Sequence, residues 1–355
     1  MHRVLIHPAT YENCREAVDR AFALFPLDIR GKKVVIKPNV LRASSAEEHI
    51  VTNPAVLRAV VDKVEEMEPA EIIVGDNPGL VNYGDNEKSF EQTGLMAAAK
   101  GHYKNLGDTS THLSFNPEFM PEIGVSSEIM EADILISLPK FKTHGLTVMT
   151  GAIKNSYGIL PGAQKARLHK LAGNPQRFHD VVTEVFRLRV PDLFIMDAVM
   201  GMEGNGPASP DIREIGLILA ADNGVAMDAV VARMMGLDPA MLRFLQNAKA
   251  FGLGSFDAND IEIEGKFRVL ADFKLPPLGG EAIIANTEIQ NLLHSRAHVK
   301  PQADPELCSS CEACVDQCPV SALTMENNIP VVDEPTCIAC FCCQEICPEK
   351  AIRLS

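Results

Sequence analysis

Residues 308–319 read Cys-Ser-Ser-Cys-Glu-Ala-Cys-Val-Asp-Gln-Cys-Pro, and this stretch decides how the C-terminal part of the chain folds. Its cysteines follow the spacing Cys-x2-Cys-x2-Cys-x3-Cys-Pro, which returns a second time at 337–348. Nine of the ten cysteines of the 355-residue chain lie within 308–347. The residues that follow each run are also alike, since 318–325 is echoed by 347–354. Each copy therefore predicts a cysteine-bearing loop, a short helix and a strand.

This spacing is typical of the [4Fe–4S] clusters of bacterial two-cluster ferredoxins, where the fourth cysteine of each run ligates the other cluster. Two-residue gaps let one tight loop bring three thiolates to three irons, and the distant fourth cysteine joins the two loops. We therefore predict two [4Fe–4S] clusters as the cofactors. The ligands of the first are Cys308, Cys311, Cys314 and Cys347. The ligands of the second are Cys337, Cys340, Cys343 and Cys318.

Other uses of these cysteines fit the spacing less well. Eight cysteines are enough for two zinc ions, but the third cysteine and the Cys-Pro of each run do not match a zinc ribbon. A disulfide framework belongs to an oxidising compartment, whereas this spacing within a larger chain points to metal. Cys342 stands outside the pattern. We expect a small buried residue beside a cluster, with a regulatory or spare ligand as the alternative.

The composition is that of an ordinary globular protein, with 46% hydrophobic and 23% charged residues. No apolar stretch is long enough to cross a membrane, and residues 1–8 are too short an apolar run for a signal peptide. We therefore expect a cytoplasmic protein that does not associate with a membrane. The iron–sulfur motifs favour a reducing setting and anaerobic metabolism.

About half of the net charge of −14 lies in residues 301–355, which carry nine acidic and two basic side chains. Such an acidic surface argues against nucleic acid as a partner. It suits docking on the basic patch of a redox partner protein or carrier, because complementary charges steer the encounter. Plain solubility explains the same charge equally well.

Residues 1–299 carry one cysteine, Cys14, and alternate short apolar runs with helical stretches. This alternation is typical of an α/β domain with a largely parallel sheet. The segment 275–304 then leads into a small α+β ferredoxin-like domain, so we predict domains at 1–299 and 300–355. Strands are expected at 4–7, 34–37, 72–76, 133–138, 193–197, 216–220 and, as an edge strand, 261–264. Helices are expected near 11–24, 54–67, 87–100, 176–189, 225–236 and 239–250.

Polar side chains follow several of these strands at their carboxyl ends, which is where open parallel sheets bind ligands. Lys37 and Asn39 follow one strand, and Asp197 ends another. Asp197 and the nearby Glu203 are candidates either to bind a divalent cation or to orient a lysine.

The segment 139–144, Pro-Lys-Phe-Lys-Thr-His, follows a third strand. In an extended backbone Lys140, Lys142 and His144 share one face, because side chains alternate. Two ammonium groups and an imidazole form an anion site for a carboxylate or phosphate, with His144 able to transfer protons near neutral pH. We assign His144 and Lys142 as catalytic residues. A solvated basic turn is the alternative.

A further polar segment lies at 150–162, where Lys154 and Asn155 stand in an otherwise apolar, glycine-containing sequence. Lys165 and His169 follow four residues apart on an expected helix and so share a face. That spacing could serve a metal or a phosphate, but an exposed helical face is the simpler interpretation. The substrate-binding residues predicted for the whole domain are Lys37, Asn39, Lys140, Lys154, Asn155 and Asp197.

These segments together resemble the iron–sulfur members of the family catalogued as domain of unknown function 362. The resemblance covers nearly the whole chain, and it supports the domain map and the choice of site residues without implying a substrate. The variant Cys340-Phe341-Cys342-Cys343 of the second cysteine run also matches that family. The other matching segments are 37–39, 140–144, 150–155, 197–198, 204–207 and 228–229.

The leading hypothesis is an iron–sulfur electron-transfer protein, either an oxidoreductase or the electron-transfer subunit of one, with a small anionic ligand on the α/β domain. Two alternatives stay open. In one, the protein is a dedicated ferredoxin whose α/β domain docks a partner complex. In the other, it is a non-redox enzyme with structural clusters. The shared-site hypothesis predicts that the chosen side chains converge in one cleft facing a cluster.

Overall fold

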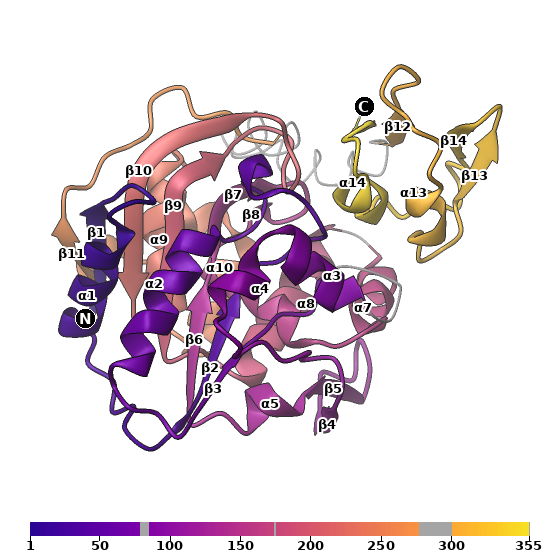
Figure 1. Ribbon diagram of the computed structural model, residues 1–355. Helices are drawn as coiled ribbons and strands as arrows, with labels where there is room; N and C mark the ends of the chain where they lie inside the picture. The colour runs from indigo at the N-terminus through magenta and orange to yellow at the C-terminus, as the bar shows by residue number, and fades with distance from the viewer. Residues whose placement is uncertain (79–84, 174, 277–299, 355) are drawn as a thin grey trace.

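The computed structural model describes residues 1–78, 85–173, 175–276 and 300–354 (Figure 1). Its centre is a mixed sheet in the order β11-β1-β10-β9-β6-β2-β3, with β7 paired to β9 and β8 paired to β7. These strands are β1 (His2–Pro8), β2 (Lys33–Pro38), β3 (Glu71–Val74), β6 (Ile134–Leu138), β7 (Lys140–His144), β8 (Val148–Met149), β9 (Leu193–Met202), β10 (Ile212–Ala221) and β11 (Ile261–Gly265).

The sheet is largely parallel, which confirms the predicted α/β class. β2 runs parallel to β3 and β6, β6 runs parallel to β9, and β11 runs parallel to β1 at the sheet edge. Two strands run the other way: β10 lies antiparallel between β1 and β9, and β8 pairs antiparallel with β7. β9 and β10 extend beyond the apolar runs at 193–197 and 216–220, since their mutual pairing continues out to Met202 and Ile212.

Helices cover both faces of the sheet, which explains why most strands are continuous apolar runs. The side chains of α1 and α2 pack on one face, and those of α8, α9 and α10 pack on the other. Asn53 caps α2 by accepting a hydrogen bond from the Ala55 N–H at 2.9 Å. The helices are α1 (Cys14–Leu24), α2 (Pro54–Glu65), α3 (Asp85–Gln92), α4 (Leu95–Ala98), α8 (Pro175–Leu188), α9 (Gly224–Met234) and α10 (Arg243–Ala250).

A small hairpin outside the main sheet is absent from the sequence prediction. It consists of β4 (Ser110–Ser114) and β5 (Glu122–Ser126), and the short helix α5 (Ser127–Met130) follows it. β4 is mostly exposed and polar, so it lacks the apolar run by which the other strands are recognised.

The C-terminal region, residues 300–354, has the repeated loop, helix and strand predicted from its cysteine runs. β13 pairs with β14, and β15 pairs with β12, both antiparallel. The predicted boundary near residue 300 adjoins 277–299, which lies outside the described residues, so it stays a prediction. The elements of the region are β12 (Pro301–Ala303), α13 (Ala313–Asp316), β13 (Leu323–Glu326), β14 (Ile329–Val332), α14 (Cys342–Ile346) and β15 (Ile352–Leu354).

The C-terminal region packs against the α/β region through the loop that leads into α14 (Figure 1). Ala339 and Phe341 are buried in the same hydrophobic core as α8 and α9. The Gln344 side chain donates a hydrogen bond to the Asn205 carbonyl at 3.2 Å. These contacts fix the second cysteine run against the sheet domain.

Candidate functional site

The structure gathers each predicted set of cluster ligands around its own cavity. One cavity is lined by Cys308, Cys311, Cys314 and Cys347, and we call it the outer cluster site. A second cavity is lined by Cys318, Cys337, Cys340 and Cys343, and we call it the inner cluster site. The exchange of the fourth cysteine between the two runs thus follows the spacing rule.

The backbone around both sites suits a cluster with bridging sulfides. Ser310 and Glu312 in the first loop have positive φ angles of 57° and 61°. Ala339 and Phe341 occupy the matching positions in the second loop, with φ angles of 51° and 58°. Successive residues that alternate in this way turn their N–H groups toward one point and form an anion nest. Four thiolates with a nest of amides are the donors that a [4Fe–4S] cluster needs.

A single metal ion fits the described residues less well. Within the described ranges no group of three or more His, Cys, Asp or Glu side chains is arranged to hold one ion. Thiolates that surround a cubane stand farther apart than the ligands of a mononuclear zinc site, so this result agrees with the cluster assignment.

The two cluster sites differ in exposure. Cys311 of the outer site is exposed, and the cavity there is lined only by residues of the C-terminal region. The inner site faces the α/β region, where Cys340 shares a small cavity with His169 and Phe178.

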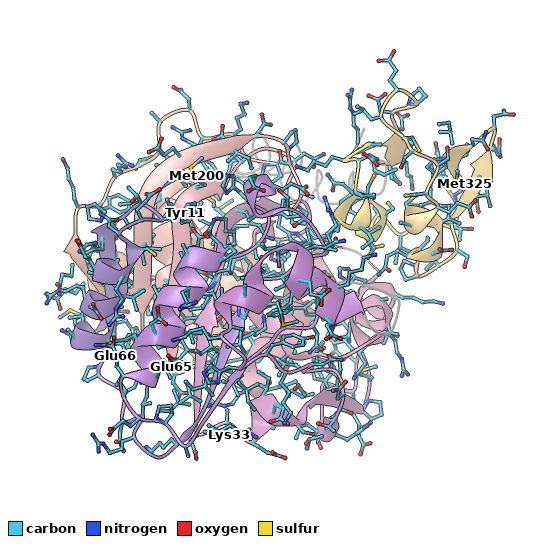
Figure 2. The ribbon with its side chains drawn as sticks, in the orientation of Figure 1. Tyr11, Lys33, Glu65, Glu66, Met200 and Met325 are labelled. Carbon is cyan, nitrogen blue, oxygen red and sulfur yellow. The ribbon has the colours of Figure 1, made fainter. Side chains whose placement is uncertain are left out.

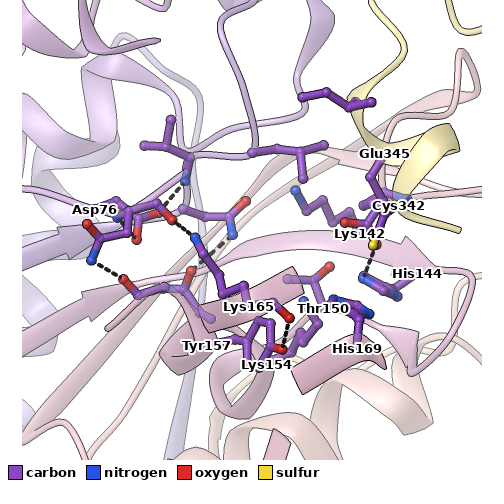
Figure 3. A pocket seen from close by; sticks show the side chains of 18 of the residues that line it. Asp76, Lys142, His144, Thr150, Lys154, Tyr157, Lys165, His169, Cys342 and Glu345 are labelled. Carbon is purple, nitrogen blue, oxygen red and sulfur yellow. Dashed lines mark hydrogen bonds and ion pairs between the residues drawn. The ribbon is translucent and has the colours of Figure 1, made fainter. Parts of the chain in front are cut away.

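A larger cavity lies where the α/β region meets α14, and we call it the central cavity (Figure 3). Its volume is about 760 Å³ when the open solvent at its mouth is included. Cys342 and Glu345 of α14 form one wall. The polar and titratable residues of the other walls are Asn39, Asp76, Asn77, Lys142, His144, Thr150, Lys154, Asn155, Tyr157, Lys165 and His169.

Three lysines face this cavity from different elements (Figure 3). The Lys142 ammonium, on β7, donates to the Ile50 carbonyl at 2.7 Å. The Lys165 ammonium, on α7 (Gln164–Ala172), donates to the carbonyls of Asn77 and Pro78. None of these contacts neutralises the lysine charge, because carbonyl groups are uncharged.

The third lysine, Lys154, comes from the short helix α6 (Ala152–Asn155). Its ammonium lies 4.9 Å from the Tyr157 ring centroid and 5.7 Å from that of Phe178, which are cation–π distances. Burial lowers the pKa of Lys154 from its ordinary value. Burial and the nearby Lys154 lower the pKa of Lys142 to about 7. Burial likewise lowers the pKa of Lys165 to about 7.

The first of two acids in the cavity wall is already paired. The Asp76 carboxylate lies 2.7 Å from the Lys37 ammonium, and both side chains are buried. The same carboxylate accepts a hydrogen bond from the Val40 N–H at 2.8 Å. Gly158, which has no side chain, lies against this pair: a Cβ atom at that position would stand 2.1 Å from Asp76 Oδ1. The close approach therefore requires a glycine.

The second acid, Glu345, lies 3.1 Å from His144 Nε2. His144 Nδ1 accepts from the Leu146 N–H at 3.1 Å, so in the neutral ring the proton is on Nε2 and faces the carboxylate. Burial and the neighbouring Lys154 lower the pKa of His144 to about 4, despite the opposing effect of Glu345. Burial acts to raise the pKa of Glu345, but His144 and Lys154 outweigh it and the net shift is downward.

The local fold that delivers Lys154 depends on contact between two segments far apart in the sequence. Asp228 on α9 accepts hydrogen bonds from the N–H groups of Ala152 at 2.6 Å and Ile153 at 3.0 Å. Gly151 has a φ of 68°, and a Cβ there would lie 2.3 Å from the Asp228 carboxylate. Asp228 thus stabilises the first turn of α6. The two segments in contact, 150–155 and 228–229, are both among those that carry the family resemblance described above.

Five of the predicted α/β site residues line the central cavity: Asn39, Lys142, His144, Lys154 and Asn155. Lys37 lies just behind the wall, where its ammonium is 3.4 Å from Asn155 Oδ1. β7 is buried along its length, so the alternative of a solvated basic turn is wrong.

The structure does not bring Lys140 and Asp197 into this cavity, so the expectation that Lys140 shares a site with Lys142 is corrected. Lys140 forms a fully buried ion pair with Asp197 at 2.7 Å, next to the Tyr11 hydroxyl. The register between β7 and β9 shifts at this point, so Lys140 lies opposite Asp197 and Lys142 lies opposite Met202. Tyr11 and Met200 lie on the opposite side of the view from Met325 in the C-terminal region (Figure 2). Asp197 therefore orients a lysine, which is one of the two roles predicted for it from the sequence.

Glu345 and Cys342 reach the site from the C-terminal region. Sequence reasoning missed Glu345; it expected Cys342 to be a small buried residue, which is confirmed, but did not place it in the cavity wall. Their positions beside the ligand Cys343 were visible, but nothing in the sequence says which face of α14 meets the α/β region. Lys165 and His169 received the simpler interpretation of an exposed helix face, yet both line the cavity. Their four-residue spacing was the signal.

Known proteins give the chain a family context. The family model described as domain of unknown function (DUF362) matches residues 34–233, and a 4Fe-4S dicluster domain matches residues 300–348. A thylakoid-associated protein of Synechocystis sp. is 32% identical over 235 residues, covering 63% of this chain and 69% of that protein. Among the described residues, no helix has the length and apolar character to span a bilayer.

Two solved structures are more distant. A crystal structure of a Thermotoga maritima protein aligns with a TM-score of 0.37 and 12% identity, over 55% of this chain and 52% of that one. The lactate racemase apoprotein from Thermoanaerobacterium thermosaccharolyticum aligns with a TM-score of 0.42 and 12% identity, over 65% of this chain and 56% of that one. This chain thus spans about half the length of each solved structure. On the extent of the family match and the curated relative, the chain belongs to the DUF362 family and carries a 4Fe-4S dicluster domain at its C-terminal end.

Proposed function

We propose that this iron–sulfur protein is an oxidoreductase that holds a small anionic substrate in the central cavity, next to one of two [4Fe–4S] clusters. When bound, the clusters supply one-electron transfer between an external carrier and that substrate. The observation that carries the proposal is the placement of α14. This one helix contains the inner-site ligand Cys343 and lines the cavity with Cys342 and Glu345.

Each residue of the cavity has a part in the proposal. Lys142, Lys154 and Lys165 attract and orient the anion, while Asn39 and Asn155 offer amide groups to it. His144 and Glu345 together hold one proton at Nε2 of the ring, within the wall of the cavity. The Lys142 ammonium, whose pKa is lowered to about 7, can pass a proton to a substrate that gains an electron.

The exposure of the outer site supports the docking of a carrier there. Cys311 is exposed, and acidic side chains such as Glu306 and Glu312 lie near it in the sequence and are also exposed. A redox partner protein with a basic patch suits this surface. The same surface also supports the second candidate function, a dedicated ferredoxin whose α/β region docks a partner complex.

The test is the reoxidation of electrochemically reduced, anaerobically purified protein. A panel of small carboxylates and phosphate esters is mixed with it, and visible cluster absorbance is followed. Native mass spectrometry of the purified protein first identifies any co-purifying ligand for the panel. We expect at least one anion to speed reoxidation of the wild type, and Lys154→Gln to abolish that effect.

Lys170→Gln is the matched control, because Lys170 is an exposed lysine on α7 and does not line the cavity. It should behave like the wild type. If no anion in the panel speeds reoxidation while a basic redox protein does, the oxidoreductase proposal fails and the ferredoxin function is favoured.

A further inference from the structure

The charges around the central cavity do not balance. Asp76 is paired with Lys37, so the two side chains together contribute no net charge to the cavity wall. Among the lining residues, Glu345 is the remaining carboxylate, and it faces the ammonium groups of Lys142, Lys154 and Lys165. With all three lysines protonated and His144 neutral, the side chains that line the cavity carry two positive charges in excess.

Polar groups in the same wall lack partners. The Thr150 hydroxyl and His169 Nδ1 are buried, and neither has a hydrogen-bond partner among the described residues. Both residues line the central cavity, as Figure 3 shows. Buried polar groups are nearly always satisfied in folded proteins, so unsatisfied ones beside uncompensated lysines point to a ligand.

We propose that the central cavity binds a compact oxyanion carrying two negative charges, and that Glu345 sets this charge by offsetting one of the three lysines. The inference rests on the proposed function and adds the charge class of its ligand. Phosphoryl compounds and dicarboxylates share this chemistry. A monoanion leaves one ammonium group uncompensated, and a trianion meets repulsion from the Glu345 carboxylate.

The test is calorimetric binding to cluster-loaded protein under anaerobic conditions at constant ionic strength. Sulfate and malonate serve as dianion probes, and nitrate and acetate serve as monoanion probes. We expect at least one dianion to bind about tenfold tighter than both monoanions, since one more charge-assisted contact contributes on the order of a tenfold change. Sulfate ahead of malonate indicates a phosphoryl-type ligand, and the reverse order indicates a dicarboxylate.

Two substitutions should change sulfate affinity in opposite directions. Lys165→Gln should weaken binding about tenfold, whereas Lys170→Gln on the same helix should leave it unchanged. Glu345→Gln should tighten binding several-fold, because it removes the opposing charge. Visible absorbance of each variant checks that the clusters are retained.

The outcomes separate this inference from the function on which it rests. Equal binding of monoanions and dianions, or weaker sulfate binding by Glu345→Gln with clusters intact, overturns the dianion inference but leaves an anionic substrate possible. Failure of every probe to bind the wild type overturns both the dianion site and the anion-binding oxidoreductase.

Discussion

At the scale of single residues, the cavity lysines respond to pH. The pKa of Lys142 and of Lys165 is lowered to about 7, chiefly by burial. Above that pH each lysine in the empty cavity loses its proton and its attraction for an anion. Sulfate affinity should therefore be greatest below about pH 6 and fall through about pH 8, by up to tenfold per unit for each lysine involved.

Binding measured across this range with sulfate, whose charge is constant there, checks the prediction. The charged groups that influence Lys142 are Lys154, Lys140, Glu345 and Asp76. Lys142→Arg keeps its charge at all these pH values and should flatten the profile. An unchanged profile in Lys142→Arg and in Lys165→Arg would show that other groups control the pH dependence.

Residue chemistry was partly predictable from the sequence. Lys142 and His144 were found because they follow an apolar strand, where sheets bind ligands, and Lys154 because it stands in an otherwise apolar segment. Lys140 was assigned to the wrong neighbourhood, since the pairing of β7 with β9 places it opposite Asp197. Whether a lysine meets a carboxylate or an open cavity depends on contacts far away in the sequence, as the Lys140–Asp197 pair shows.

At the scale of elements, the loop before α14 anchors the inner cluster site. Phe341 is 2% exposed and packs in the core of the α/β region. Phe341→Ala should destabilise this attachment by about 3 kcal/mol, because it removes a buried aromatic ring and leaves a cavity. The inner site should then lose iron faster, which bleaching of visible absorbance by a chelator measures.

Val331→Ala is the control for that change, because Val331 is 40% exposed on β14 of the same region. It should bleach at the wild-type rate. Equal rates for Phe341→Ala and the wild type would mean that the attachment does not protect the inner site.

Most elements were predictable, because continuous apolar runs and helical stretches with recognisable starts alternate along the chain. The helix expected near 54–67 is one example, since α2 begins at Pro54 after the capping residue Asn53. The β4–β5 hairpin was not predicted, since an exposed polar strand carries no periodic signal. The sequence also could not predict which face of α14 lies toward the α/β region, because that face is determined by how the two regions pack together.

At the scale of the whole molecule, the central cavity and the inner cluster site share α14. Reduction adds negative charge at the inner site, so a dianion in the cavity should bind the oxidised protein more tightly. By linkage, the bound dianion lowers the midpoint potential of the inner cluster. A tenfold difference in affinity between the two redox states corresponds to about 59 mV for one electron.

A spectroelectrochemical titration in saturating sulfate, compared with chloride at equal ionic strength, measures this shift. The potential of the outer cluster should change far less, because its cavity is lined by the C-terminal region alone. Equal shifts of both potentials would indicate a general effect of salt instead of a ligand in the cavity.

The exposure of Cys311 has one more consequence, which concerns damage by air. Oxygen and the products of its reduction reach Cys311 of the outer site directly, while Phe341 and the sheet domain cover one side of the inner site. We therefore expect oxidative loss of iron to begin at the outer site. A briefly aerated molecule should keep the central cavity and the cluster beside it, but lose the cluster through which we propose that a carrier exchanges electrons.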